Sequence, residues 1–410
     1  MKRLNALFAG IAILMPFQFL SAQKTGAILQ DNPSPISVIG SEKLSSFSLQ
    51  RNIALDLATF KRDGDEIGKQ NSYGFNLDYN YYPKGKWGFG TTIFLNQTTN
   101  DFNTTKTTNT DFGAFANISL IEVLNPQTAI YGRVGVGYIS DILKVTSGSN
   151  SDKQSNDGFA IRGTVGLPVH LDKFAYVTPF VQYQYQSGSV EDGKFTDSRF
   201  GAGVNLEGYL RCHEDYKCDS KNDYKFSKNA YDPGSNMFGF WTTADFSSGT
   251  INTKYDDGDE TKDKYSNVNI SVDYTRYWWD GIGIGMELRV KNDVQESKDF
   301  DFKLSSTTLD VSPKIVFQGP FDGGARNLFL EAKGTFGSQT FKTTSGSNSN
   351  TIKDNVSGFG LGFGYNCFFS ENLALTPIIG YDWATLKDDE SGEKQKRNTF
   401  RLGLGVRANF

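Results

Sequence analysis

The chain has 410 residues, of which 43 are glycine and 14% are aromatic. Its formal net charge of −4 provides no basic field that would attract nucleic acid. The mean hydropathy is −0.44, and after residue 22 no apolar run is long enough to form a membrane-spanning helix. Abundant glycine and aromatic residues with only 11 prolines are typical of many antiparallel strands.

The first 22 residues have the pattern of a secretory signal peptide. Lys2 and Arg3 supply a positive start, residues 6–20 are mainly apolar, and Ser21-Ala22 provides small residues for cleavage. The apolar stretch is short for a retained helix, and no stop-transfer charges follow it. We therefore expect residues 1–22 to be removed on export and residues 23–46 to form an N-terminal periplasmic segment.

Long segments that follow show strict alternation of apolar and polar side chains. In residues 266–278, Val268 and Ile270 fall on one face of an extended chain, and Asn267 and Asn269 fall on the other. A helix would scatter these residues around its axis. A strand that separates lipid from an enclosed polar interior sorts them in this way.

Eight segments of this kind precede residue 211. Tight turns such as residues 82–86 connect alternate segments, and connections that are mostly longer and polar, such as Lys61–Asn71, join the others. Short connections at one end and longer ones at the other are typical of outer-membrane barrels, whose short turns are periplasmic. The predicted strands are residues 47–60, 72–83, 87–100, 110–124, 128–145, 158–171, 175–190 and 197–210.

The segment 237–410 repeats the design of the segment 47–210. Asp78-Tyr79 falls on Asp273-Tyr274, and the sequence TSGSN occurs at the corresponding place in both segments. Shared strand composition alone would not preserve order and spacing in this way. We interpret the chain as a tandem duplication of an eight-stranded unit.

The sixteen strands could close as one wide barrel or as two narrow ones. Positions expected to face inward are rich in glycine, which suits a crowded lumen, and the polar segment 211–236 is much longer than the other connections at that end. We therefore predict an all-β fold of two tandem transmembrane antiparallel up-and-down barrels, residues 47–210 and 237–410, joined by a periplasmic linker. The alternative is a single sixteen-stranded barrel, which would enclose a water channel.

Charged side chains are predicted on the inner face of both repeats. A charge enclosed in a narrow barrel is costly unless it is paired, so we expect ion-pair networks that fill the lumen and leave no transport path. A steady large conductance would contradict this expectation. By strand parity the inward charges are Asp56, Asp78, Arg133, Arg162 and Arg199 in the first repeat and Asp245, Asp273, Glu331, Lys333 and Arg401 in the second.

An acidic cluster occupies the first outer connection of each repeat. Carboxylates of this kind suit hard divalent cations, either directly or as bridges to lipopolysaccharide. A solvated Asp-Gly hairpin turn explains the same residues, and the spacing does not match a complete calcium loop, so we favour the turn. The residues are Asp63, Asp65 and Glu66, then Asp256, Asp257, Asp259 and Glu260.

Few residues suggest chemistry beyond this. His170 and His213 are predicted on the periplasmic side, whereas known barrel enzymes hold a histidine near the outer rim, so we expect neither an enzyme nor a cofactor. Cys212 and Cys218 are close enough for a disulfide in an oxidising compartment, with two free thiols as the alternative. Cys367 fits a strand as a small hydrophobic residue.

Residues 401–410 form an alternating strand that ends in Phe410, which resembles the signal read by the outer-membrane assembly machinery. With its strand count, turn lengths and inward glycines, the chain resembles, twice over, the small outer-membrane barrel family of the OmpA transmembrane domain and the OmpX-like and OmpW-like proteins. The resemblance implies location in a Gram-negative outer membrane, in contact with lipid and lipopolysaccharide. We expect a structural or surface-interaction role through extracellular loops that meet an unknown ligand, with a passive channel as the alternative.

Overall fold

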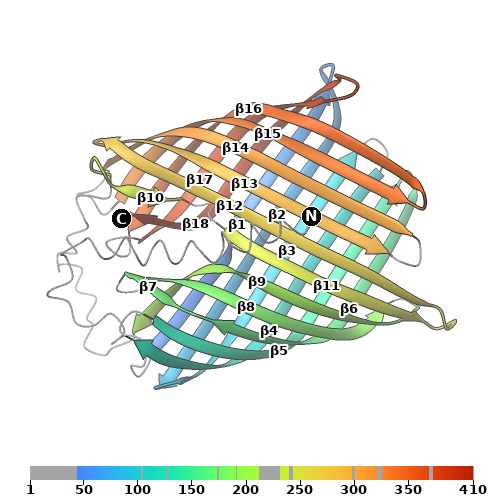
Figure 1. Cartoon of the computed structure of the whole chain (residues 1–410), viewed down its shortest axis with the longest axis horizontal. Coiled ribbons are helices and arrows are strands. Elements are labelled where there is room, and N and C mark those ends of the chain that lie inside the picture. The colour runs from blue at the N-terminus through green and yellow to red at the C-terminus, as the bar shows by residue number, and fades with distance from the viewer. Residues whose placement is uncertain are drawn as a thin grey trace.

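The computed structural model describes residues 44–102, 105–125, 128–172, 175–190, 192–211, 231–239, 243–297, 301–320, 326–368 and 373–409. The predicted signal peptide, His213, both linker cysteines and Phe410 lie outside these residues. Within them, every regular element is a β-strand. The strands wrap around a common axis in a strongly tilted sheet (Figure 1).

Eighteen strand segments make up the sheet. They are β1 (Leu44–Arg62), β2 (Asp65–Lys84), β3 (Trp87–Phe102), β4 (Thr105–Asn125), β5 (Thr128–Ser147), β6 (Asn150–Gly166), β7 (Val169–Asp172), β8 (Ala175–Val190), β9 (Gly193–Arg211), β10 (Asn236–Phe238), β11 (Thr243–Tyr255), β12 (Glu260–Trp279), β13 (Ile282–Ser297), β14 (Phe302–Pro320), β15 (Arg326–Ser345), β16 (Asn348–Phe368), β17 (Leu373–Asp388) and β18 (Lys394–Asn409).

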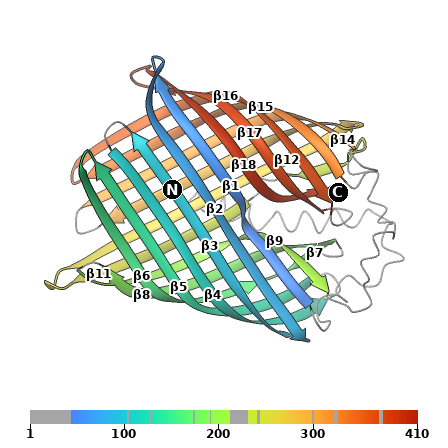
Figure 2. The ribbon, with the colours of Figure 1, turned by 180° about the vertical axis from the view of Figure 1, so that it is seen from behind.

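The sheet closes on itself as a single antiparallel barrel. β7 continues the line of β6, since both lie between β5 and β8, and β10 shares with β11 the place beside β12. The eighteen segments therefore occupy sixteen positions. Two seams join the halves of the chain: β1 pairs with β18 from Ile53 to Arg62, and β9 pairs with β11 along its first twelve residues, from Gly193 to Val204. Figure 2 shows β1 and β18 side by side.

Near the tight-turn end, the same strands exchange partners. The start of β1, Leu44 to Ser48, pairs with the end of β9, and β10 pairs with the end of β18. β1 makes this change where its register with β2 slips, between Leu49 and Ala54. Each half of the chain thus closes on itself over a few residues, while the rest of the barrel is continuous around all sixteen positions.

The prediction of two separate eight-stranded barrels is therefore not confirmed, and the closed sixteen-stranded alternative describes the sheet. The physical reason lies in the unpaired edges that each half would present. Over most of their length, β1 and β18 satisfy each other's backbone groups, as do β9 and β11. The length of the polar segment between β9 and β10, which led to the prediction of two barrels, is equally compatible with one.

The two faces of the strands are sorted as in a membrane barrel. Large apolar side chains such as Phe159, Val134 and Ile161 are exposed on the outside. Polar and charged side chains such as Asp78 and Glu331 are buried on the inside. This sorting is the reverse of that in a water-soluble protein and matches strands that face lipid outside and a polar lumen inside.

The exposed apolar side chains cluster in the half of the barrel that carries the tight turns. A strand of 20 residues, such as β5, spans roughly 68 Å along its axis, or about 48 Å of height at a tilt of about 45°. The apolar band of such barrels is only about 25 Å tall. The outer ends of the strands therefore continue the barrel beyond the membrane as a polar wall.

This extension corrects the predicted outer loops. Lys61–Asn71, expected to be a loop, contains only the two-residue turn Asp63-Gly64 between β1 and β2. The connection expected between the predicted strands 128–145 and 158–171 is largely strand β6. Both Asp63 and Gly64 have positive φ, as a tight hairpin turn requires. Alternation disappears in these segments because neither face meets lipid, although the backbone ladder continues.

Candidate functional site: the polar lumen

The interior of the first half holds a buried ion pair within a network of neutral hydrogen bonds. Arg133 Nη1 of β5 donates to Asp78 Oδ2 of β2 over 2.5 Å, and both side chains are buried. Asn80 and Thr92 donate to the same carboxylate at 2.7 and 3.1 Å. The network continues as Ser119 accepts from Arg133 Nε at 3.2 Å. Asp78 therefore has charged and neutral donors together.

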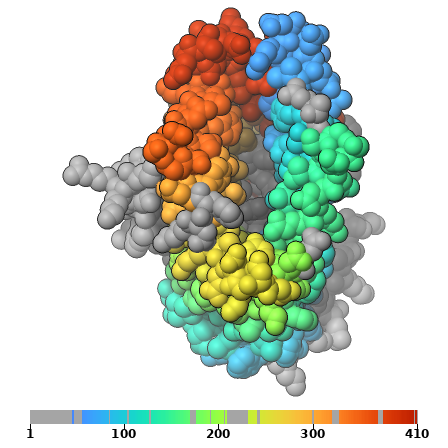
Figure 3. Space-filling model, turned by 90° about the vertical axis from the view of Figure 1, so that its right-hand side faces the viewer, coloured from blue at the N-terminus to red at the C-terminus, as the bar shows by residue number. Residues whose placement is uncertain are grey.

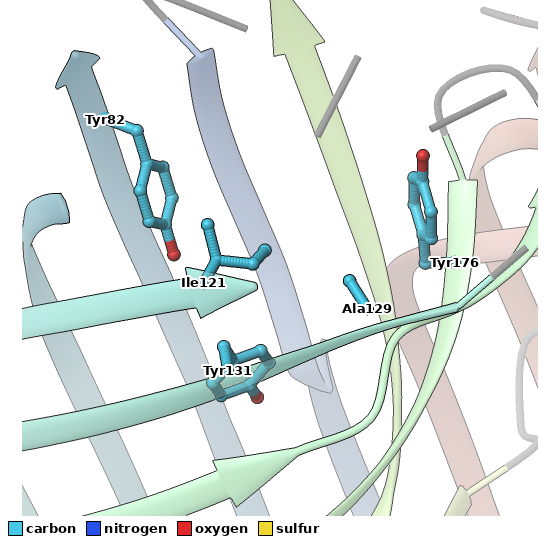
Figure 4. Close-up of a cluster of buried hydrophobic side chains, with 5 residues drawn as sticks. All are labelled: Tyr82, Ile121, Ala129, Tyr131 and Tyr176. Atoms are coloured by element: carbon cyan, nitrogen blue, oxygen red, sulfur yellow. The ribbon is translucent and has the colours of Figure 1, made fainter. Parts of the chain in front are cut away.

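An apolar cluster lies beside this network near the tight turns. Figure 4 shows its five side chains, which come from β2, β4, β5 and β8. Tyr131 also reaches across the lumen, where its hydroxyl donates to Glu207 Oε1 at 2.9 Å. The cluster and the ion pair together fill the lumen of the first half at this end. The cluster residues are Tyr82, Ile121, Ala129, Tyr131 and Tyr176.

The corresponding place in the second half holds a chain of charges. Lys314 of β14 contacts Asp273 and lies 3.9 Å from Glu331. Arg407 Nη2 lies 3.4 Å from the same Glu331, and its guanidinium packs 3.7 Å from the Phe329 ring centre. All four charged residues are buried. Two cations and two carboxylates thus neutralise one another in the interior.

A second charge cluster lies farther toward the hairpin end of the same half. Glu287 accepts from Lys333 and Arg289, both at 2.9 Å. Arg401 Nη2 donates to Asp382 Oδ1 at 3.0 Å and its Nε lies 2.8 Å from Oδ2, while Lys333 lies 4.0 Å from Asp382. The second half is therefore held by connected ion pairs over a large part of its height.

Among the described residues, one cavity lies mainly in each half of the lumen. The cavity of the second half, about 190 Å³, lies against the Glu287–Lys333 cluster and has Asp56, Asp310 and Arg397 in its wall. The cavity of the first half, about 170 Å³, has five amide side chains in its wall, including Gln182, Gln184 and Asn205, together with apolar side chains such as Phe94 and Phe180. Figure 3 views the hairpin end, where a hollow lies between the orange strands of the second half and the teal strands of the first.

One network links the halves directly. Tyr265 of β12 donates to Asp197 of β9 at 2.9 Å and accepts from Arg199 Nε at 2.6 Å. Arg199 Nη2 also lies 3.0 Å from Asp197. These contacts lie along the β9–β11 seam, so the seam is held by side chains as well as by the backbone ladder.

The structure places the ten predicted lumen charges on the inner face, and it groups most of them. Asp78 lies with Arg133, and Asp273 with Glu331. Arg401 forms a cluster with Lys333, whereas Arg162 packs over the Phe115 ring at 3.8 Å. Asp56 faces Arg401 in register across the β1–β18 seam, and Asp245 accepts from Asn269 at 3.1 Å.

Sequence reasoning did not single out Lys314, which shares its charge between two carboxylates. Parity with Ser312 would have placed Lys314 inside, but the neighbouring inward position is Val316, a fully buried apolar residue. An apolar residue on the inner face removes the polar alternation that would reveal the strand's orientation.

The acidic hairpin residues are all exposed, and they do not gather into a cation site. Glu66 pairs with Lys69 at 3.0 Å and Glu260 with Lys254 at 3.3 Å, while Asp257 accepts the backbone N–H of Asp259 at 3.0 Å. In the described part of the chain, no group of three or more histidine, cysteine or acidic residues is arranged to hold a metal. Cys367 is a half-buried free thiol on β16.

A model of the outer membrane protein beta-barrel domain matches residues 226–407, and a model of the autotransporter beta-domain matches residues 57–209. One barrel-family match thus falls on each half of a closed sheet that is apolar outside and polar inside. The chain is an outer-membrane β-barrel protein. Among its described residues, no helix is long and apolar enough to cross a membrane.

No curated protein matches this outer-membrane barrel. Solved structures similar to it include Ail of Yersinia pestis, with 22% identity over 41% of this chain and 99% of that chain and a TM-score of 0.27. The translocator domain of autotransporter NalP from Neisseria meningitidis has 12% identity, with 98% of each chain covered and a TM-score of 0.24. A Pseudomonas aeruginosa FadL homologue has 10% identity, with 92% of each chain covered and a TM-score of 0.32.

Proposed function

We propose that this barrel is a passive outer-membrane channel of narrow bore for small polar solutes. The single observation that supports this function is that one closed sixteen-position sheet surrounds a polar interior containing two cavities. Sixteen strands enclose more space than side chains alone fill, whereas eight strands do not. The filled regions beside the tight turns act as the constrictions, and the hollow hairpin end acts as the outer vestibule.

Conductance in planar bilayers tests the channel. We expect small current steps, well below those of an open sixteen-stranded porin, because solutes must pass the side chains around Asp78 or Lys314. Tyr277→Ala removes a fully buried ring from the constriction of the second half and should raise the step size. The matched control is Tyr183→Ala, which removes an exposed, lipid-facing ring and should leave conductance unchanged.

The channel would be contradicted if bilayers that contain the wild type, or folded Tyr277→Ala, conducted no better than lipid alone. Folding is checked by the strand signal in circular dichroism and by the altered gel mobility of unheated barrel. Conductance as large as that of an open porin would contradict the constrictions instead, because their side chains would then not obstruct the lumen.

The second candidate is a surface-interaction protein. The observation in its favour is the polar wall beyond the apolar band, where cross-strand pairs such as Thr99 with Thr108 at 3.2 Å and Gln70 with Asn100 at 2.9 Å offer hydrogen-bonding groups. Removing residues 144–153 shortens the β5–β6 hairpin without touching either constriction. Loss of cell adhesion at unchanged conductance would favour this role over the channel.

We also propose that the chain reaches the outer membrane through cleavage of residues 1–22 and recognition of Phe410 by the assembly machinery. We propose no catalytic role. We propose that Cys212 and Cys218 form a disulfide. Mass spectrometry of the purified barrel tests both processing events. We expect Gln23 at the mature N-terminus and a mass two hydrogens below that of the fully reduced chain.

A further inference from the structure

We propose that the cavity in the first half of the barrel is a binding subsite for a neutral polyhydroxylated solute about the size of one sugar ring. The subsite deepens the proposed channel function by naming its solute class, although binding itself does not require passage. The cavity is enclosed by β2 to β9 and the edge of β11, in the wide part of the barrel beyond the Asp78–Arg133 pair.

The chemistry of the wall favours hydroxyl groups over charged ones. Five amide side chains line the cavity, and an amide both donates and accepts, as a hydroxyl does. Three phenyl rings, those of Phe94, Phe180 and Phe246, line the same space and offer an apolar surface for the C–H groups of a ring. The amides are Asn76, Asn96, Gln182, Gln184 and Asn205.

The wall carries four charged residues, Asp111, Arg162, Arg199 and Asp245, and the last three are engaged with protein partners. Asp245 accepts from Asn269. Arg162 Nε donates to Gln184 at 3.3 Å and its guanidinium packs over Phe115. Arg199 is held by Asp197 and Tyr265. An ionic ligand would have to compete with these contacts, whereas a neutral one can bond Asn205 without breaking any of them.

Asn205 supplies an independent indication of a ligand. Its side chain is only 6% exposed, yet among the described residues its Nδ2 has no hydrogen-bond partner. A buried donor without a partner is unfavourable and is rare in folded proteins. Because Asn205 lines the cavity, a hydroxyl oxygen of a bound solute would satisfy it.

The cavity also has a suitable size. At about 10 to 15 Å³ for each water-sized group, its volume of about 170 Å³ accommodates roughly a dozen such groups. The cavity of the second half is similar in volume but differs in chemistry. Its wall carries four acidic and four basic side chains, and Gln70 is its one amide. Fixed ion pairs there leave little for a neutral solute to bind.

Isothermal titration calorimetry with D-glucose tests the proposal. The full barrel is used in a detergent without a sugar headgroup, with gluconate and glucosamine as charged ligands of matched size. We expect saturable glucose binding and at least about tenfold weaker binding of both charged ligands. Asn205→Leu and Asn96→Leu should each weaken glucose binding by about three- to tenfold, the effect of one neutral hydrogen bond. The control, Gln70→Leu in the other cavity, should not change it.

Absence of saturable glucose binding up to about 100 mM would overturn the subsite, as would equal affinity in folded wild type, Asn205→Leu and Asn96→Leu. Gluconate that binds as tightly as glucose would also overturn it. Glucose binding without conductance would support the subsite and contradict the channel. Conductance without glucose binding would support the channel and contradict the subsite.

Discussion

The two halves of the barrel share a backbone plan but stabilise their interiors with different charges. Asp78 of β2 faces Thr92 across the sheet, whereas Asp273 of β12, in the corresponding place, faces Glu287. Four residues farther along each strand, Tyr82 and Tyr277 are both fully buried. The scaffold positions therefore correspond, while the chemistry around them has diverged.

The sign of an interior charge is not kept between the halves. Arg133 and Glu331 lie the same number of residues before the repeated sequence TSGSN. Arg133 neutralises Asp78, whereas Glu331 is itself neutralised by Lys314 and Arg407. Because an unpaired buried charge is unfavourable with either sign, what has to be retained is the pairing.

The halves also differ in how many charges depend on one another. In the first half, Asp78 accepts from two neutral donors as well as from Arg133. In the second half, Lys314 and Lys333 each lie between two carboxylates. We therefore expect the second half to tolerate loss of one cation less well than the first.

The largest expected effect comes from Lys314→Met. The substitution keeps the side-chain length but leaves Asp273 and Glu331 buried with one fewer cation, which should destabilise the barrel by about 3 to 5 kcal/mol. Arg133→Met should destabilise it less, since Asn80 and Thr92 still donate to Asp78. Urea unfolding in lipid vesicles measures both free energies, and equal losses would contradict the difference between the halves.

A double-mutant cycle on Asp78 and Arg133 sharpens the comparison. Asp78→Asn alone leaves a buried arginine and Arg133→Met alone leaves a buried carboxylate, whereas the double variant leaves neither charge. We expect the double variant to be at least about 1 kcal/mol more stable than the sum of the single losses implies. Additive losses of stability would mean that Asp78 and Arg133 do not stabilise each other.

Cross-linking tests whether the halves form one barrel. In a variant with serine at all three native cysteine positions, Ala58→Cys with Thr399→Cys joins β1 to β18, and Ser46→Cys with Tyr209→Cys joins β1 to β9. We expect both disulfides to form in the same molecule, as measured by mass after proteolysis. Two separate barrels would form only the second disulfide, and a barrel without the partner exchange only the first.

The sequence predicts the two faces of each strand better than it predicts which strand edges pair. Alternation reveals which side of each strand meets lipid, because hydrocarbon excludes charge, so parity was enough to select Asp78 and Arg401 as inward residues. It says little about which edges pair, since β1 and β10–β11 present similar backbone groups to β9 and β18. Ligand chemistry was harder still, because the amides that line the first cavity lie on four different strands and share no local motif.

The smallest expected effect is at the last hairpin of the second half, outside the membrane. Lys353 lies 2.9 Å from Asp389 and donates a hydrogen bond that lowers the pKa of its carboxyl group below the usual range. A lowered pKa stabilises the folded state at pH values above the unfolded pKa of about 3.9. This stabilisation is lost as the pH falls through the folded pKa.

Asp389→Asn should therefore change the urea midpoint only slightly at pH 7, because both groups are exposed. It should also make the midpoint fall less between about pH 5 and pH 3 than it does in the wild type. The control is Asp192→Asn, in the corresponding hairpin between β8 and β9 of the first half. Unfolding in urea at both ends of this pH range provides the measurement. An acid dependence unchanged by Asp389→Asn would show that the contact with Lys353 does not couple protonation to folding, and would leave the buried clusters as the source of any difference between the halves.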